Sequence, residues 1–353
     1  MSILFAILLF SFLIFIHELG HFVAAKLSGV QVNEFSMFMG PAIFKKQVGE
    51  TLYSIRCIPI GGYCAMEGED GGSDNPRSFE KAAWWKRLII LVAGAAMNFI
   101  AGVLIFAILY LPGNQVVVPV ISEFTDCCIF NHESGLQLGD EILEIDGEKI
   151  YTNGDISLIL DLNKTTHHDV TVLRDGNKLV FDDLLMAHTH QNEDGSEYLH
   201  YGFGFGQVKT VGFPEKVGFV WKVVADNVRS VRLSLQMLFT GKAGVQDMSG
   251  PVGIVQMMSD VASESDTAML AFLNMLSFGG MIAVNLAIMN LLPIPALDGG
   301  RIVGVLVTTV YEKITHKKID PKYEGYLHGA GMFLLLGLMA IIMFKDIFVI
   351  FRG

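Results

Sequence analysis

Long apolar stretches constrain this chain more than any other feature of its sequence. A bilayer requires about 20 apolar residues per helix, because its hydrocarbon core is about 30 Å thick. Only 17% of the 353 residues are charged, whereas an average soluble domain carries about 25%. We therefore expect a polytopic α-helical membrane protein. Its four transmembrane helices are predicted at 3–25, 88–111, 271–292 and 327–344.

The segment between the second and third predicted crossings differs in composition from the rest. Residues 112–225 carry 18 acidic and 7 basic side chains, which accounts for the whole net charge of −11. Alternating apolar and polar residues, with tight turns at Asp146-Gly147 and Asp175-Gly176, predict strands and hairpins. We expect an inserted α/β domain over 112–210, between an N-terminal membrane part (1–111) and a C-terminal one (266–353).

The distribution of charge predicts an orientation in the membrane. Lys and Arg gather in the connections before the second crossing and between the third and fourth. The positive-inside rule places both connections in the cytoplasm, so the inserted domain and both termini are expected to be extracytoplasmic. The acidic balance, without a basic stripe, disfavours nucleic acid as a partner.

Residues 211–265 show the pattern of amphipathic helices. Apolar residues recur every three or four positions between Val217 and Leu238, and Arg229 and Arg232 fall on the opposite side. Several charges make a crossing costly there, so we expect helices that lie along the outer membrane surface. The two arginines are then expected to contact lipid phosphates.

The clearest chemical signal lies late in the first crossing, in His17-Glu18-Leu19-Gly20-His21. Positions i and i+4 share one face of a helix, so both imidazoles can reach one metal ion. Glu18 is suited to accept a proton from metal-activated water. The alternative is a structural cluster of histidines satisfied by neighbouring helices. Ionisable groups within an apolar span are rare and usually functional, which favours the metal site.

A zinc site needs a third protein ligand, and Asp298 is the candidate. Pro293 and Pro295 interrupt helical hydrogen bonding within a predicted membrane span, and Gly299-Gly300 permits backbone geometry closed to other residues. Irregular backbone at membrane depth is tolerated only where protein buries it or where it lines a watery cavity. The alternative is that Asp298 caps the helix that follows it.

Together these motifs resemble the site-2 protease family of intramembrane zinc metalloproteases, and within it the bacterial branch with one extracytoplasmic PDZ domain. The resemblance implies that His17, His21 and Asp298 bind Zn²⁺ and that Glu18 is the catalytic acid/base. It also implies that Asn290, Pro293 and Pro295 hold the substrate backbone. The segments that carry the resemblance are 17–21, 94–99, 134–147, 249–254 and 290–300.

The same resemblance implies two further structural features. Residues 33–65 are similar to a membrane-associated β-hairpin on which the substrate pairs as an extended strand, although Phe38 stands where relatives often carry glycine. The inserted domain is similar to a PDZ domain, which would take a peptide as an added strand or filter substrates by size. A plain spacer domain is the alternative.

The function implied is zinc-dependent cleavage of transmembrane segments of single-pass membrane proteins, such as an anti-sigma factor, in the inner (cytoplasmic) membrane of a bacterium. Clearance of remnant signal peptides, or maturation of a peptide signal, is an alternative use of the same chemistry. A non-catalytic membrane binding protein and an ion-coupled transporter are alternatives of another class. The acid Glu18 counts against the former, and the His17–His21 pattern has no rationale in transport.

Overall fold

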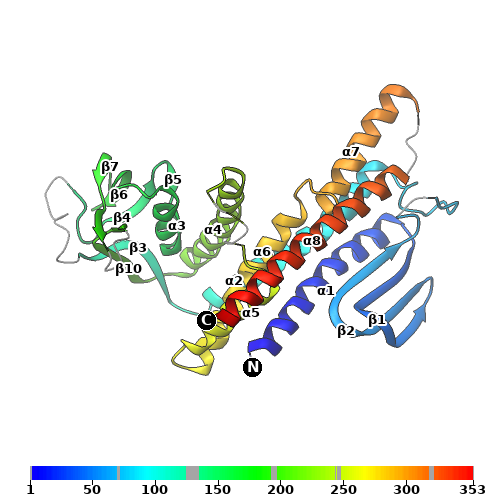
Figure 1. Cartoon of the computed structure of the whole chain (residues 1–353), viewed down its shortest axis with the longest axis horizontal. Coiled ribbons are helices and arrows are strands. Elements are labelled where there is room, and N and C mark those ends of the chain that lie inside the picture. The colour runs from blue at the N-terminus through cyan, green and yellow to red at the C-terminus, as the bar shows by residue number, and fades with distance from the viewer. Residues whose placement is uncertain are drawn as a thin grey trace. The chain divides into compact units, whose positions relative to one another are not determined.

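The structure is a computed structural model that describes residues 2–69, 72–124, 135–191, 197–242, 244, 248–317 and 322–352. It divides into two compact units (Figure 1). Unit 1 comprises Met1–Ile105 and Ala243–Gly353, and unit 2 comprises Phe106–Lys242.

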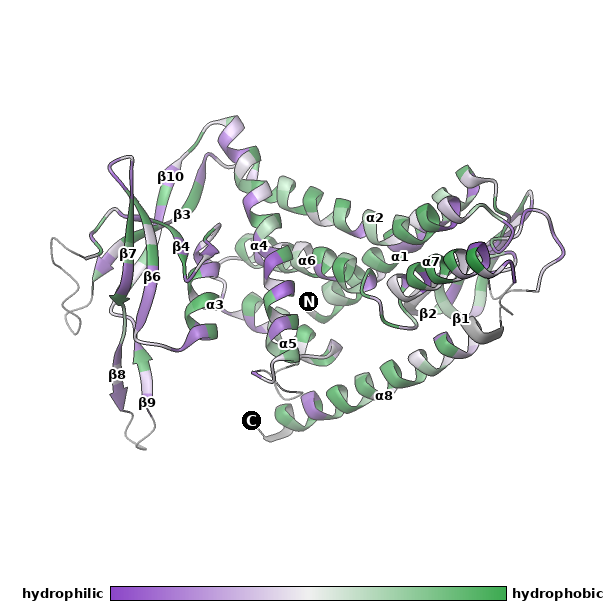
Figure 2. Cartoon of the chain, turned by 90° about the horizontal axis from the view of Figure 1, so that it is seen from above, coloured by the Kyte–Doolittle hydropathy of each residue, from purple (hydrophilic) through white to green (hydrophobic). Residues whose placement is uncertain are grey.

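Within the described residues, four helices are long and apolar enough to cross a membrane, as the sequence predicts. Their apolar character is evident along most of their length in Figure 2. The third expected crossing ends earlier than predicted, at Asn290, because the residue before Pro293 is disfavoured in helical geometry. The four helices are α1 (Ser2–Ser28), α2 (Trp84–Tyr110), α6 (Ala268–Asn290) and α8 (Lys322–Arg352).

The expected hairpin is present in unit 1 and packs against α1 (Figure 1). It consists of antiparallel strands β1 (Val32–Val48) and β2 (Thr51–Met66), and the ring of Phe35 packs against Phe22 of α1. Phe38 has a φ of 70°, a conformation that favours glycine. A glycine at this position would adopt the same backbone conformation without strain.

A polar contact ties the two strands of the hairpin together. The Oγ of Ser54 donates to Glu34 at 2.7 Å, and the guanidinium of Arg56 donates to the same carboxylate at 2.8 Å. Burial opposes ionisation of Glu34, but these two hydrogen bonds hold its pKa below the ordinary value. The carboxylate is therefore charged and paired at neutral pH.

Two shorter helices complete the described part of unit 1, namely α5 (Pro251–Ser263) and α7 (Asp298–Thr315). The start of α5 is bound by α8: the carboxylate of Asp346 accepts from the backbone N–H groups of Gly250 (2.8 Å) and Gly253 (2.9 Å). A carboxylate is favoured there because the first N–H groups of a helix lack partners within it. The motif 249–254 therefore anchors the C-terminal end of α8.

Unit 2 contains an antiparallel sheet with strand order β10-β3-β4-β6-β7, in which β5 also pairs with β4. The predicted turns at 146–147 and 175–176 join β4 to β5 and β6 to β7. A second, two-stranded sheet pairs β8 with β9. The elements are β3 (Gln115–Phe124), β4 (Glu141–Ile145), β5 (Glu148–Lys149), α3 (Asn153–Asn163), β6 (His167–Arg174), β7 (Asn177–Leu185), β8 (His188–Gln191), β9 (Glu197–His200), β10 (Phe203–Thr210) and α4 (Phe213–Phe239).

Helix α4 belongs to unit 2, so this unit extends beyond residue 210, where we expected the inserted domain to end. Its Arg229 is buried and forms an ion pair with the fully buried Asp155 of α3. Asp226 accepts a hydrogen bond from Thr152 at 2.8 Å. The prediction that Arg229 contacts lipid phosphates is therefore wrong, because an amphipathic period shows that one face is covered without showing what covers it.

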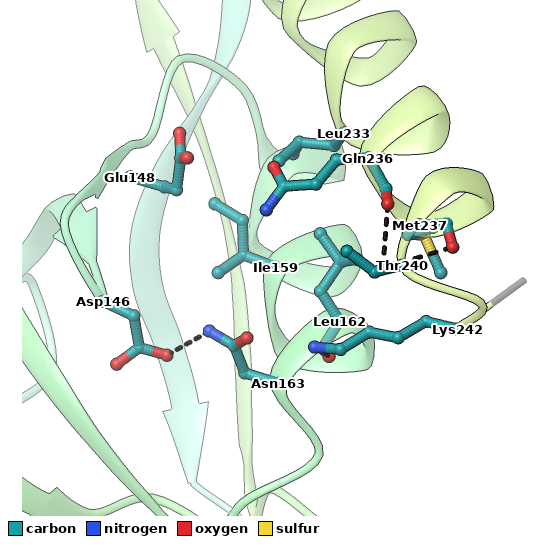
Figure 3. Close-up of a pocket in the computed structure, with 10 residues that line it drawn as sticks. All are labelled: Asp146, Glu148, Ile159, Leu162, Asn163, Leu233, Gln236, Met237, Thr240 and Lys242. Atoms are coloured by element: carbon teal, nitrogen blue, oxygen red, sulfur yellow. Dashed lines mark hydrogen bonds between the residues drawn. The ribbon is translucent and has the colours of Figure 1, made fainter.

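A cavity of about 260 Å³ lies between α3 and α4 (Figure 3). Several of its polar side chains have partners in unit 2. Asp146 accepts from Asn163 at 2.7 Å, Lys242 donates to the carbonyl of Leu162 at 3.4 Å, and Glu148 pairs with Arg232. None of the candidate catalytic residues lines this cavity.

The buried ion pair makes a prediction about the stability of unit 2. Replacing Arg229 by Met leaves Asp155 buried without its counter-charge, so we expect a loss of about 3 kcal/mol. Arg232→Met is the matched control: its ion pair with Glu148 is on the surface and its side chain is 54% exposed, so we expect a loss below about 1 kcal/mol. Urea unfolding of the full chain in detergent, read by proteolysis within unit 2, measures both. Equal losses of unfolding free energy in the two variants would contradict the assignment of Arg229 and Asp155 as a buried, stabilising ion pair.

Candidate metal centre

Helix α1 places His17 and His21 one turn apart on the same face, as the four-residue spacing predicts. Their rings meet edge to face with centroids 4.8 Å apart, and their Nε2 atoms lie 3.2 Å apart. The Nδ1 atom of His21 lies 2.8 Å from the carbonyl oxygen of Ile90. A carbonyl only accepts, so this Nδ1 carries the proton and the Nε2 of the neutral ring presents a lone pair.

Asp298 joins the two histidines from the other end of the chain. Its Oδ2 lies 3.2 Å from Nε2 of His17 and 3.3 Å from Nε2 of His21. It is the first residue of α7, and Leu297 occupies the N-cap position, so the alternative role as a helix cap is not the one that the structure shows. Among the described residues, this is the one group of three potential metal ligands.

The spacing of these atoms fits a zinc ion. Two ligands at about 2.05 Å in tetrahedral directions are about 3.3 Å apart, and the three distances here are 3.2, 3.2 and 3.3 Å. Oδ2 of Asp298 is buried without a hydrogen-bond partner within the described part of the chain. Two imidazole nitrogens and one carboxylate oxygen leave the fourth position of a catalytic site open.

Glu18 lies beside this group without belonging to it. Its side chain is half-buried on α1, and its Cγ is 3.6 Å from the position that a Cβ on Gly62 of β2 would take. The hairpin therefore borders the side of the site on which Glu18 lies. A carboxylate next to the ligands can exchange a proton with water or substrate.

Glycines on α2 and α7 give this site its close packing. A Cβ on Gly94 would lie 2.3 Å from Nε2 of His21 and 2.8 Å from Cε1 of His17. Helix α2 can therefore approach the two imidazoles this closely only because residue 94 is a glycine. A Cβ on Gly299 or Gly300 would lie 2.2 or 2.3 Å from the carbonyl oxygen of Leu292 or Ile294. Neither Gly299 nor Gly300 has a positive φ, so close approach explains this pair rather than the special backbone geometry that we expected.

Asn98 is a residue for which sequence reasoning assigned no role. It is 1% exposed on α2, and its Nδ2 lies 3.4 Å from Nδ1 of His17. Its Oδ1 is buried without a partner within the described residues. A half turn of the amide brings Oδ1 against Nδ1–H of His17, which leaves Nε2 free for a metal. The signal in the sequence that could have revealed Asn98 is that it is a lone polar residue in an apolar span.

The three predicted substrate-binding residues lie on the segment that leads to Asp298. Asn290 is the last residue of α6, and Pro293 is exposed in the turn that follows. Pro295 is half-buried and contacts the backbone of α8 at Gly331. The structure brings His17, His21 and Asp298 together, and Asn290, Pro293 and Pro295 remain predictions.

Comparison with known proteins gives the family of the chain. The family model described as "Peptidase family M50" matches residues 5–338. A Clostridium perfringens protein named "Putative zinc metalloprotease" is 36% identical over 348 residues, 98% of each chain. A Fusobacterium nucleatum protein with the same name is 32% identical over 364 residues, 100% of each chain. The Bacillus subtilis "Regulator of sigma-W protease RasP" is 27% identical over 426 residues, 97% of each chain.

Four helices of spanning length and a group of three potential metal ligands, both found among the described residues, are consistent with a metalloprotease of the membrane. The chain belongs to peptidase family M50, the zinc-dependent family of the site-2 proteases. The family and the cofactor implied by the motifs are thereby confirmed.

The clearance at Gly94 predicts a loss of metal. In Gly94→Ala the new methyl group overlaps Nε2 of His21, so the imidazole must turn away and we expect zinc affinity to fall by about 10–100-fold. Gly337→Ala is the control, because a Cβ at Gly337 meets nothing within 4 Å. Competition with a chelator in detergent measures both affinities. Equal affinities in the two variants would show that α2 can withdraw.

The contact with His17 predicts opposite outcomes for two substitutions of Asn98. Asn98→Leu removes the acceptor for Nδ1–H, so we expect zinc affinity to fall about 10–100-fold. Asn98→Asp keeps an acceptor of the same shape, so we expect it to bind zinc more tightly than Asn98→Leu does. The same chelator competition tests the pair, and equal or tighter binding by the leucine variant would refute this role.

Proposed function

We propose that this chain is a zinc-dependent endopeptidase that cleaves its substrates within the membrane. The observation that carries the proposal is the convergence of His17, His21 and Asp298 around one point. The two histidines, with Glu18 beside them, are on α1, an apolar helix of spanning length. His17 and His21 lie in the second half of that helix, so the site lies between the middle of the candidate span and its C-terminal end.

The residues divide the chemistry between them. The chemistry that bound zinc supplies is Lewis acidity, which polarises a carbonyl group and acidifies water. His17, His21 and Asp298 hold the ion. Glu18 accepts the proton of the attacking water and delivers it to the leaving nitrogen, and Asn98 and Ile90 keep the two imidazoles in the ligating tautomer.

A helical substrate must unwind before a peptide bond can be attacked, because a helix hides its carbonyl groups. The hairpin β1–β2 offers a place for the unwound segment at residues 62–65 of β2. These residues pair with residues 34–37 of β1 on one side and have no second partner strand among the described residues. The backbone of β2 passes Glu18 at Gly62. We infer that the substrate adds to this hairpin as a strand and that Asn290, Pro293 and Pro295 contact its backbone.

Unit 2 has a feature suited to recognising an extended segment. Strand β10 is at the end of the strand order, and both its middle and the segment that leads into it lie beside α3. Tyr201, just before the strand, donates to the carbonyl of Leu160 at 3.3 Å, and a Cβ on Gly206 would lie 2.7 Å from Asn153. We propose that unit 2 is PDZ-like and extracytoplasmic, and that it receives a segment of the substrate on this edge or limits substrate size.

The proposed substrates are single-pass proteins of a bacterial cytoplasmic membrane. A relative at 27% identity is named a regulator of sigma-W protease, which favours a regulatory substrate such as an anti-sigma factor over remnant signal peptides. The positive-inside rule supports an extracytoplasmic position for both termini and for unit 2 in this membrane.

Two substitutions separate proton transfer from metal binding. Glu18→Gln keeps the size of the side chain but cannot accept the proton, so we expect unchanged zinc content and a loss of cleavage of at least about 100-fold. Asp298→Asn weakens the ligand set, so we expect zinc content itself to fall. Cleavage of a membrane-embedded reporter and metal analysis of the purified variants are the measurements. Persistent cleavage by Glu18→Gln would overturn the proposed mechanism.

A further inference from the structure

Helix α8 touches the rest of unit 1 mainly through its ends. Only 11% of its candidate span is buried, against 28–39% for the other three, and in Figure 2 its middle stands apart from α1, α2 and α6. Its C-terminal end is bound to α5 through Asp346. Its other end contacts the segment that leads from α6 to Asp298.

Two residues of α8 make that second contact. The backbone N–H of Ala296 donates to Nδ1 of His328 at 3.1 Å. One turn further, the backbone of α8 lies directly against Pro295, because a Cβ on Gly331 would be 2.4 Å from the proline Cβ and 2.7 Å from its carbonyl oxygen. Since an N–H group donates, Nδ1 of His328 must present its lone pair to Ala296.

The segment that His328 contacts requires support from outside itself. Ala296 has a φ of 79°, a left-handed conformation that residues with a Cβ avoid and that persists only where the surroundings fix it. Asp298 follows two residues later, and its Oδ2 must lie within 3.3 Å of both histidines. A change of the Ala296 backbone would therefore move the carboxylate.

We propose that His328 is a positioning residue: by accepting the hydrogen bond of Ala296, it holds the strained turn in the conformation that presents Asp298 to the two histidines. The inference rests on the proposed metal centre and deepens it. It makes the third zinc ligand dependent on the docking of α8 through His328 and Gly331.

Substitutions of His328 that keep or remove an acceptor at the δ position test the proposal. His328→Asn carries Oδ1 at the position of Nδ1, whereas His328→Leu has a similar branch without an acceptor. We expect His328→Leu to raise the Kd for zinc about 10–100-fold, and His328→Asn to stay within about threefold of the wild-type chain. Chelator competition on the full chain in detergent provides the Kd.

Three outcomes would overturn the proposal: wild-type affinity in His328→Leu, equal weakening in Leu and Asn, or weakening in Asn alone. Rescue by Asn is the result that a role in packing alone would not give. A second readout is the reporter reaction at saturating zinc, where we expect His328→Leu to lower kcat and leave KM within about twofold, because Asp298 holds the ion that takes part in the chemical step and does not contact the rest of the substrate.

The glycines of α8 supply a second, independent pair. Gly331→Ala adds a methyl group where Pro295 lies and should push α8 from the turn, with a rise in the zinc Kd of at least about tenfold. Gly329→Ala lies on the same helix, where a Cβ meets nothing within 4 Å, and should bind zinc as the wild-type chain does. Equal affinities in the two variants would contradict the docking. Zinc binding is measured without catalysis, so failure of the peptidase proposal and failure of this one are distinguishable.

Discussion

Three electron-pair donors that lie within 3.3 Å of one another repel unless a cation lies among them. The surroundings of this group act to hold it in spite of that repulsion. The carbonyl of Ile90 fixes one imidazole, the amide of Asn98 contacts the other, and Gly94 leaves both rings room against α2. The carboxylate comes from a turn more than 270 residues further along the chain. The site therefore depends on how α1, α2 and α7 pack, and the binding of zinc must stabilise that packing in return.

The sequence could predict the parts of this site that depend on local geometry. His17 and His21 share a helix face whatever surrounds them, and the apolar spans follow from composition. Asp298 was predicted from the conflict between a broken helix and membrane depth. The reasons for Gly94, Asn98 and the pair Gly299-Gly300 were beyond the sequence, because each depends on which backbone lies opposite. For Gly299-Gly300 the expected reason, unusual backbone angles, was replaced by close approach to carbonyl groups.

Helix α4 of unit 2 shows what an amphipathic period cannot predict. The period of α4 indicates a covered face, and both a lipid surface and a protein domain satisfy it. The ion pair of Arg229 with Asp155 decides for protein along this part of the helix. Strand β10 escaped prediction because Gly204 and Gly206 depress the β propensity of its segment. Its pairing with β3 is nonlocal in sequence and leaves no local periodic signal.

The anchoring of α8 at its two ends has a mechanical consequence. The apolar run 327–344 within its candidate span is about 27 Å long at a rise of about 1.5 Å per residue, close to a hydrocarbon core of about 30 Å. A bilayer that is thinner or thicker than this run is accommodated by a tilt of the helix or by deformation of the lipid around it. Because the middle of α8 has few contacts with the rest of unit 1, the stress of a thinner or thicker bilayer falls on the contacts of α8 with α5 and with Pro295 and Ala296. The lipid environment is thus coupled mechanically to the turn that precedes Asp298, the proposed third metal ligand.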